Sequence, residues 1–74
     1  KDKEIFMSLT TRFGGAVREV RQSLEMSQEA LAHEAGINRS HISQIELGVK
    51  SPGLSTVERI ALALDCPVSL LLKD

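Results

Sequence analysis

The stretch of sequence that decides the fold lies at residues 27–46 and reads SQEALAHEAGINRSHISQIE. Ser27 is a good N-cap, so we expect it to start a helix over residues 28–35. Gly36 follows as a stop signal, because glycine adopts a positive φ at the end of a helix at little cost. This half of the stretch predicts a short helix that ends in a tight turn.

The second half of the stretch predicts another short helix, over residues 39–47. Asn38 is its N-cap, Ile42 and Ile45 form its buried side, and Gly48 ends it. Two short helices joined by a tight turn make a helix-turn-helix, in which the second helix can enter the major groove of DNA. An ordinary helical hairpin in a bundle has the same outline and is the competing interpretation.

Outside this stretch, apolar spacing predicts three more helices and no strand. The first begins after an N-cap at Thr10 or Thr11, and the last is a short helix from Pro67 to about residue 72. The apolar stripes of the first and fourth helices consist of Phe13, Val17, Val20 and Leu24, and of Leu54, Val57, Ile60, Ala61 and Leu64. The sequence therefore predicts an all-α fold of five helices.

Two adjacent glycines, Gly14 and Gly15, interrupt the first of these helices. Each costs about 1 kcal/mol in a helix relative to alanine. We expect close packing against a neighbouring element to be the benefit that offsets this cost.

Length and composition exclude several classes of protein. The 74 residues allow one domain, which we divide into an N-terminal extension at residues 1–9 and a helix-turn-helix domain at residues 10–74. The single cysteine, Cys66, excludes an intrachain disulfide, and the presence of only two histidines argues against a zinc site, so no metal or cofactor is expected. No run spans a bilayer and no signal peptide is visible, which predicts a cytoplasmic protein without a membrane partner.

The charge balance argues against indiscriminate binding to nucleic acid. The formal net charge is −1, and the small basic surplus falls within residues 36–53, where Arg39 and Lys50 oppose Glu46. The aromatic content of only 3% argues against a surface that binds single-stranded nucleic acid by stacking its bases on aromatic side chains. A single copy is expected to bind duplex DNA weakly, and salt is expected to weaken the binding further.

The outward face of the helix over residues 39–47 carries hydrogen-bonding side chains where a merely soluble helix would carry Glu and Lys. Arginine pairs with guanine and glutamine with adenine, while serine adapts to either. The candidate base-reading residues are therefore Arg39, Ser40, Ser43 and Gln44. A neutral polar face without a partner remains the alternative.

Glu46 falls near the inner side of the same helix, where a carboxylate needs a partner. Arg21, at the end of the first helix, is the candidate, and we expect an Arg21–Glu46 pair that ties that helix to the helix over residues 39–47. A solvated glutamate is the alternative that the helical wheel leaves open.

Four residues are candidate phosphate contacts. Gln28 is the first residue of its helix, where free backbone N–H groups attract anions. Lys50 follows Gly48, although surface lysines are usually only solvated. Asn38 and His41, at the start and at one edge of the proposed reading helix, complete the set.

Taken together, these residues resemble the phage-repressor-like, Xre-type helix-turn-helix family. The matching stretches are residues 17–21, 27–32, 35–37, 40–48, 51–52 and 60–64. They cover roughly residues 12–72 in order, which is far more specific than an isolated helix-turn-helix match. The resemblance implies a compact five-helix, lambda-repressor-like domain that binds a near-palindromic operator in double-stranded DNA, usually as a dimer.

The resemblance also implies residue roles. By position, Gln28 matches the family's phosphate-binding glutamine, Arg21 and Glu46 match a frequent structural pair, and the four candidate base readers match its base-reading positions. Gly53 stands where the family usually caps the fourth helix with serine, and Leu47 stands where a polar or basic residue is common. Residues 1–9 have no clear counterpart.

A homodimer has an argument of its own in the last helix. Val68 and Leu71 suit the core, which leaves Leu70 and Leu72 for a partner subunit. Further apolar residues near the other end of the chain are Ile5, Phe6 and Leu9. Packing of residues 5–9 within the monomer is the alternative.

The leading hypothesis is a sequence-specific transcriptional regulator, a repressor or autoregulator, that reads the major groove with residues 39–47. The alternative is a protein-interaction module that keeps the fold without binding DNA, which the net negative charge favours and the Arg/Ser/Gln face opposes. An enzyme is not expected, because His33, His41 and Cys66 form no recognisable catalytic arrangement. No small-molecule pocket is evident from the sequence.

Overall fold

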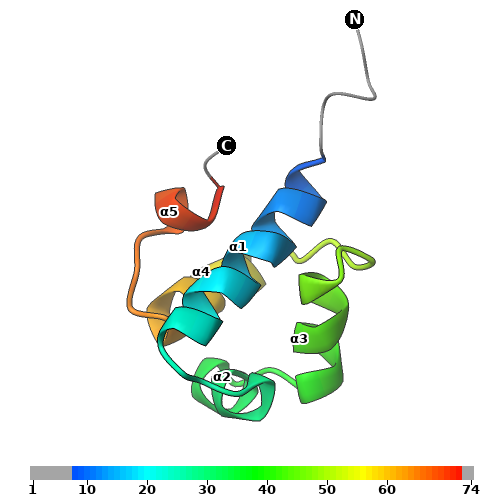
Figure 1. Cartoon of the computed structure of the whole chain (residues 1–74). Helices are drawn as coiled ribbons and strands as arrows, with labels where there is room; N and C mark the ends of the chain where they lie inside the picture. Colours follow the sequence, from blue (N-terminus) through cyan, green and yellow to red (C-terminus); the bar gives the residue numbers. More distant parts are fainter. Residues whose placement is uncertain (1–7, 73–74) are drawn as a thin grey trace, which may run out of the picture.

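The computed structural model describes residues 8–72, which form five helices (Figure 1). In chain order these helices are α1 (Leu9–Ser23), α2 (Gln28–Ala35), α3 (Arg39–Glu46), α4 (Leu54–Ala63) and α5 (Val68–Leu72). Residues 8–72 contain no strand. The expected all-α fold of five helices is confirmed.

The start of α1 differs from the expectation that Thr10 or Thr11 caps it. The N-cap is Ser8, whose extended backbone lets its side-chain oxygen accept a hydrogen bond from the Thr11 N–H at 3.2 Å. Thr10 and Thr11 therefore lie in the first turn of the helix, and Leu9 is its first residue. Ile5 and Phe6 lie outside the described residues, so the domain boundary expected at residue 10 stays an expectation.

Helix α1 lies in the middle of the molecule and packs against α3 on one side and α5 on the other (Figure 1). Helix α2 packs against α3 and α4. The largest fully buried side chains come from all five helices and are Phe13, Val17, Leu31, Ile42, Ile45, Ile60 and Leu71. Each contributes roughly 1.5–3 kcal/mol by leaving water, so this one cluster holds α2 and α3 in a fixed relation to α1.

Gly14 lets α1 approach the backbone of α3 closely. A Cβ built at Gly14 would overlap the Ile45 carbonyl oxygen and would stand 3.1 Å from the Ile45 carbonyl carbon and 3.2 Å from the Glu46 carbonyl oxygen. At Gly15 no atom of another helix lies within 4 Å of the corresponding position. The expected packing role therefore belongs to Gly14 and not to Gly15.

Two residues assigned to apolar stripes lie outside the core. Leu24 is 51% exposed and forms the C-cap of α1, which ends at Ser23. Leu54 is 86% exposed at the first residue of α4, one turn before the buried Val57. None of the described helices is both long and apolar enough to cross a membrane.

Candidate nucleic-acid interface

A tight turn joins α2 to α3. Gly36 takes a left-handed conformation, with φ 67° and ψ 38°. Its N–H donates to the His33 carbonyl at 3.2 Å, and the Ile37 N–H donates to the Ala32 carbonyl at 2.9 Å. These two bonds satisfy carbonyls that the end of a helix leaves free. The chain therefore changes direction within three residues, so that α3 crosses α2 and packs against it.

Side-chain caps fix where both helices begin. Ser27 accepts a hydrogen bond from the Ala30 N–H at 2.9 Å, and α2 spans the predicted residues. Asn38 accepts from the His41 N–H at 3.3 Å. Helix α3 ends at Glu46, one residue earlier than expected, because Leu47 forms the C-cap and Gly48 follows with φ 76°.

Helix α3 presents a polar side to solvent. Ile42 and Ile45 are fully buried beneath it, whereas Arg39, Ser40 and Gln44 are exposed. These exposed side chains are the long arginine and glutamine that suit guanine and adenine edges, together with a short hydroxyl. The helix therefore has the exposure that the predicted reading role requires.

The two serines of this helix differ in their surroundings. The Ser40 hydroxyl donates to the Asn38 side-chain oxygen at 2.7 Å, so its own oxygen remains as an acceptor. Ser43 is half-buried. Arg39 and Gln44 therefore offer the more accessible donors of the four candidate base readers.

Arg21 and Glu46 form an ion pair between α1 and α3. The Arg21 Nε donates to Glu46 Oε2 at 2.6 Å and its Nη2 donates to Glu46 Oε1 at 2.9 Å. The exposed fractions of the two side chains are 10% and 3%. Hydrogen bonding to Glu46 raises the pKa of Arg21 above its ordinary value, against the opposing effect of burial. The solvated glutamate that the helical wheel left open does not occur.

Gln28 belongs to the same group of side chains. Its Nε2 donates to Glu46 Oε1 at 3.0 Å, which places the amide between the ion pair and the first turn of α2. Sequence reasoning assigned Gln28 to phosphate and missed this bond. The two residues are 18 positions apart, and their contact depends on how α2 crosses α3, which no local spacing encodes.

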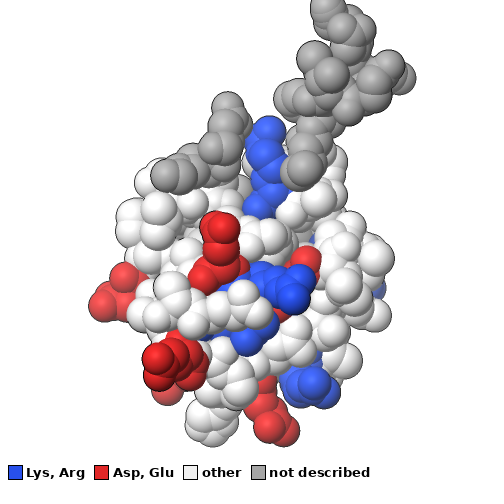
Figure 2. Space-filling view, in the orientation of Figure 1, with Lys and Arg blue, Asp and Glu red and all other residues white. Residues whose placement is uncertain are grey.

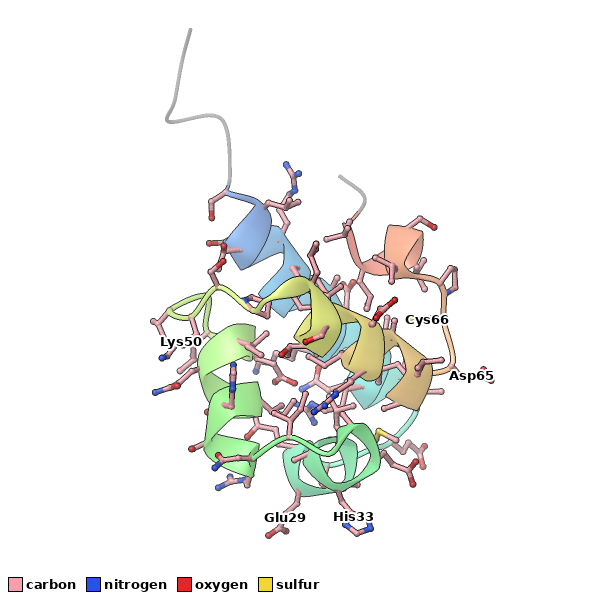
Figure 3. The ribbon with its side chains drawn as sticks, turned by 180° about the vertical axis from the view of Figure 1, so that it is seen from behind. Glu29, His33, Lys50, Asp65 and Cys66 are labelled. Atoms are coloured by element: carbon pink, nitrogen blue, oxygen red, sulfur yellow. The ribbon has the colours of Figure 1, made fainter. Side chains whose placement is uncertain are left out.

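The remaining candidate phosphate contacts lie around α3. Lys50 is exposed on the loop that follows α3 and lies on the α3 side of the molecule, whereas Asp65 and Cys66 lie on the far side (Figure 3). His41 is half-buried, and the side chain of Asn38 is engaged in capping. Lys50 is therefore the most accessible cation of this group.

Charge is distributed locally and not as one basic field. On the face drawn in Figure 2, basic and acidic side chains are interspersed. This agrees with the formal net charge of −1. Attraction to an anionic partner would therefore depend on a few placed contacts more than on long-range potential.

The apolar residues expected at a partner interface are only partly exposed. Leu70 is 38% exposed, whereas Leu72 is half-buried and packs against the core. The expectation that Leu72 is left unpacked is wrong, because positions 68, 71 and 72 share one face of a helix. Leu62, which the sequence analysis did not single out, is 79% exposed on α4. It lines a shallow hollow of about 270 Å³ with Cys66 and Pro67.

Comparison with known proteins identifies related chains. Residues 17–71 match a family model, HTH_3, that is described as helix-turn-helix. The control protein C.BamHI of Bacillus amyloliquefaciens is 45% identical over 53 residues, a match that covers 70% of this chain. The immunity repressor protein of Bacillus phage phi105 is 34% identical over 61 residues, which covers 82% of this chain. The match spans 65% of the first of these relatives and 42% of the second, less than two thirds of either.

A solved structure gives the same picture. The restriction-modification controller protein C.AhdI from Aeromonas hydrophila superposes with a TM-score of 0.82 at 34% identity. The superposition covers 84% of this chain and 94% of that one. The expected lambda-repressor-like arrangement of five helices is confirmed by this likeness.

Proposed function

This chain belongs to the helix-turn-helix family of transcription regulators, and on that premise we propose that it binds operator DNA with α3 in the major groove. The observation that carries the proposal is the exposed polar side of α3 above two fully buried isoleucines. The family is one of regulators and not of enzymes, which confirms the interpretation against catalysis.

Base reading is assigned to the exposed side of α3. Arg39 is suited to guanine O6 and N7, and Gln44 to adenine N6 and N7, each bidentate pair giving about 1–3 kcal/mol of discrimination. Ser40 and Ser43 supplement them. Gln28, Asn38, His41 and Lys50 are assigned to the phosphate backbone, which sets the register of the helix in the groove.

The proposed active form is a homodimer on a near-palindromic operator. One copy presents a small footprint with a net charge of −1, so two half-sites are needed for useful affinity. Leu62 and Leu70 are the exposed apolar candidates for the contact between subunits. Leu72 packs partly against the core, so only the remaining exposed part of its side chain is available to a partner subunit. The names of the relatives, a control protein and a phage repressor, favour repression or autoregulation. Such a protein acts in the cytoplasm, where its DNA lies.

The test begins with the selection of bound duplexes from a random library. We expect two inverted half-sites whose centres are about 34 Å apart, one helical turn. Retention of no duplex at low salt would refute DNA binding and favour a protein-interaction module. A single unpaired half-site, together with a monomer in sedimentation equilibrium, would refute the dimer.

Two substitutions then separate base reading from backbone contact. Arg39→Ala should cost about 1–3 kcal/mol on the selected duplex and relax specificity at one base pair per half-site. Lys50→Ala should weaken binding to selected and random duplexes alike and lower the salt slope. Arg18→Ala, on an exposed arginine of α1, is the charge-matched control and should change neither. Equal losses for Arg39→Ala on both duplexes would reassign Arg39 to the backbone.

A further inference from the structure

The Glu46 carboxylate serves two partners from two different helices. Its Oε1 accepts from Arg21 Nη2 at 2.9 Å and from Gln28 Nε2 at 3.0 Å. Its side chain is only 3% exposed, while Gln28 is half-buried at the first position of α2. The Gln28 amide therefore forms a bridge between a buried charge and the surface of the protein.

The bond to Glu46 determines which way the Gln28 amide faces. An ionised carboxylate only accepts hydrogen bonds, whereas a glutamine amide has two N–H donors on one end and an acceptor oxygen on the other. Nε2 must therefore face Glu46, and the amide oxygen cannot replace it there. One N–H of Nε2 is used by Glu46, and the second remains for another acceptor.

We propose that Glu46 is a positioning residue for DNA binding, which holds the Gln28 amide so that its second N–H meets a backbone phosphate. This inference rests on the proposed function. In the reversed orientation, the amide oxygen would face the phosphate oxygens and an attraction would become a repulsion. Because Glu46 is the last residue of α3, the same contact links the phosphate at α2 to the position of the reading helix.

The bond is not needed to neutralise Glu46. Arg21 already donates to both carboxylate oxygens, and its remaining Nη1 donates to the Met26 carbonyl at 2.8 Å. The hydrogen bonds of Arg21 are therefore enough to stabilise the ion pair without Gln28. What the additional bond fixes is the orientation of Gln28.

A double-mutant cycle tests the proposal. Affinities of wild type, Gln28→Ala, Glu46→Gln and the double variant are measured by fluorescence anisotropy on the selected duplex and on a random-sequence duplex. Circular dichroism verifies that each variant is folded at the assay temperature. Gln28→Ala should weaken binding to both duplexes about tenfold, as expected for one hydrogen bond to a charged group. Gln22→Ala, on an exposed glutamine of α1, is the matched control and should leave affinity unchanged.

The decisive comparison is the effect of Glu46→Gln in the two backgrounds. In the wild type it should weaken binding by about threefold or more, because the amide at position 46 no longer dictates the orientation of Gln28. In the Gln28→Ala background it should change affinity less than twofold. Equal losses in both backgrounds, with wild-type binding intact, would show a merely structural role and overturn the proposal. Absence of wild-type binding would instead refute the proposed function.

A second measurement needs no folded Glu46 variant. The side-chain amide signals of Gln28 are assigned in a nitrogen-15 correlation spectrum by their absence in Gln28→Ala. In the free protein the proton held at the Glu46 carboxylate should resonate downfield of the usual range for glutamine amides, and the selected duplex should shift the other proton. Shifts in the usual range for both Gln28 protons in the free protein, or an unmoved second proton on saturation with the duplex, would overturn the proposal.

Discussion

Replacing Gly14 with alanine tests the packing of α1 against α3 directly. The added Cβ would overlap the Ile45 carbonyl oxygen and would press on the Glu46 carbonyl oxygen at 3.2 Å. Both obstacles are backbone atoms of α3, so no side chain can rotate away to make room. The helix as a whole must move, and with it the side chains that the proposed function places in the groove.

The magnitude follows from two opposing effects. Alanine gains about 1 kcal/mol over glycine in the interior of a helix. Overpacking a core typically costs about 1–3 kcal/mol, and a rigid backbone obstacle belongs at or above the upper end of that range. We therefore expect Gly14→Ala to lower the free energy of unfolding by about 2 kcal/mol.

Gly15→Ala is the matched control within the same helix. No atom of another helix lies within 4 Å of its new Cβ, so only the gain of about 1 kcal/mol remains. The two variants should thus differ by about 3 kcal/mol. In a domain of this size each kcal/mol shifts Tm by about 4–8 °C, which separates their melting temperatures by about 10 °C or more.

The assay is thermal and urea unfolding followed by circular dichroism, with duplex affinity measured at a temperature at which both variants are folded. Gly15→Ala should bind as the wild type does, whereas Gly14→Ala should bind more weakly because α3 is displaced. If Gly14→Ala were as stable as Gly15→Ala, the close approach of α1 to α3 would not constrain the fold, contrary to this prediction.

Three further predictions concern stability and reactivity. Arg21→Ala should destabilise the fold by about 3–5 kcal/mol in urea unfolding, because it leaves the Glu46 carboxylate buried without its charged partner; a loss under 1 kcal/mol would contradict this. Gly36→Ala should lower the free energy of unfolding by about 1 kcal/mol in the same assay, because alanine is strained at φ 67°, and Gly36→Asn should be better tolerated. Equal losses of stability for the two variants would speak against left-handed strain as the cause. Burial, and secondarily the Asp65 carboxylate, raises the pKa of the Cys66 thiol above its ordinary value. Less thiolate is therefore present at pH 8, and alkylation of Cys66 should be slower in the folded chain than in the urea-unfolded chain. Equal rates of alkylation would disprove the effect.

The helices themselves were predictable because their signals are local. Ser27 and Asn38 cap the helices that follow them, and Gly36 ends the helix before it, all through bonds that span three to five residues. The buried positions of α3 follow from helical periodicity in the same way. The start of α1 was misplaced because Ser8, Thr10 and Thr11 are all acceptable caps, and only the backbone conformation selects among them.

The exposure of individual apolar residues was harder to predict. Leu54, at the start of α4, and Leu62, on its outer side, occur in an apolar segment but are exposed, while Leu72 packs inward where an outward position was expected. Which side of a short helix is covered depends on the neighbours that pack against it. In the five residues of α5, positions 68, 71 and 72 share one face, but the sequence does not show which face the neighbouring helices cover.

By itself, the sequence determined where α2 and α3 start, which turn joins them, and which hydrogen-bonding side chains α3 carries. Those features depend on interactions between residues close together in the chain. Tertiary structure alone decided that Gly14 meets the backbone of Ile45 and that Gln28 joins the Arg21–Glu46 pair. These contacts connect residues 18 to 31 positions apart, and they exist because the shared core fixes the crossing of α1, α2 and α3, a geometry that no local pattern specifies.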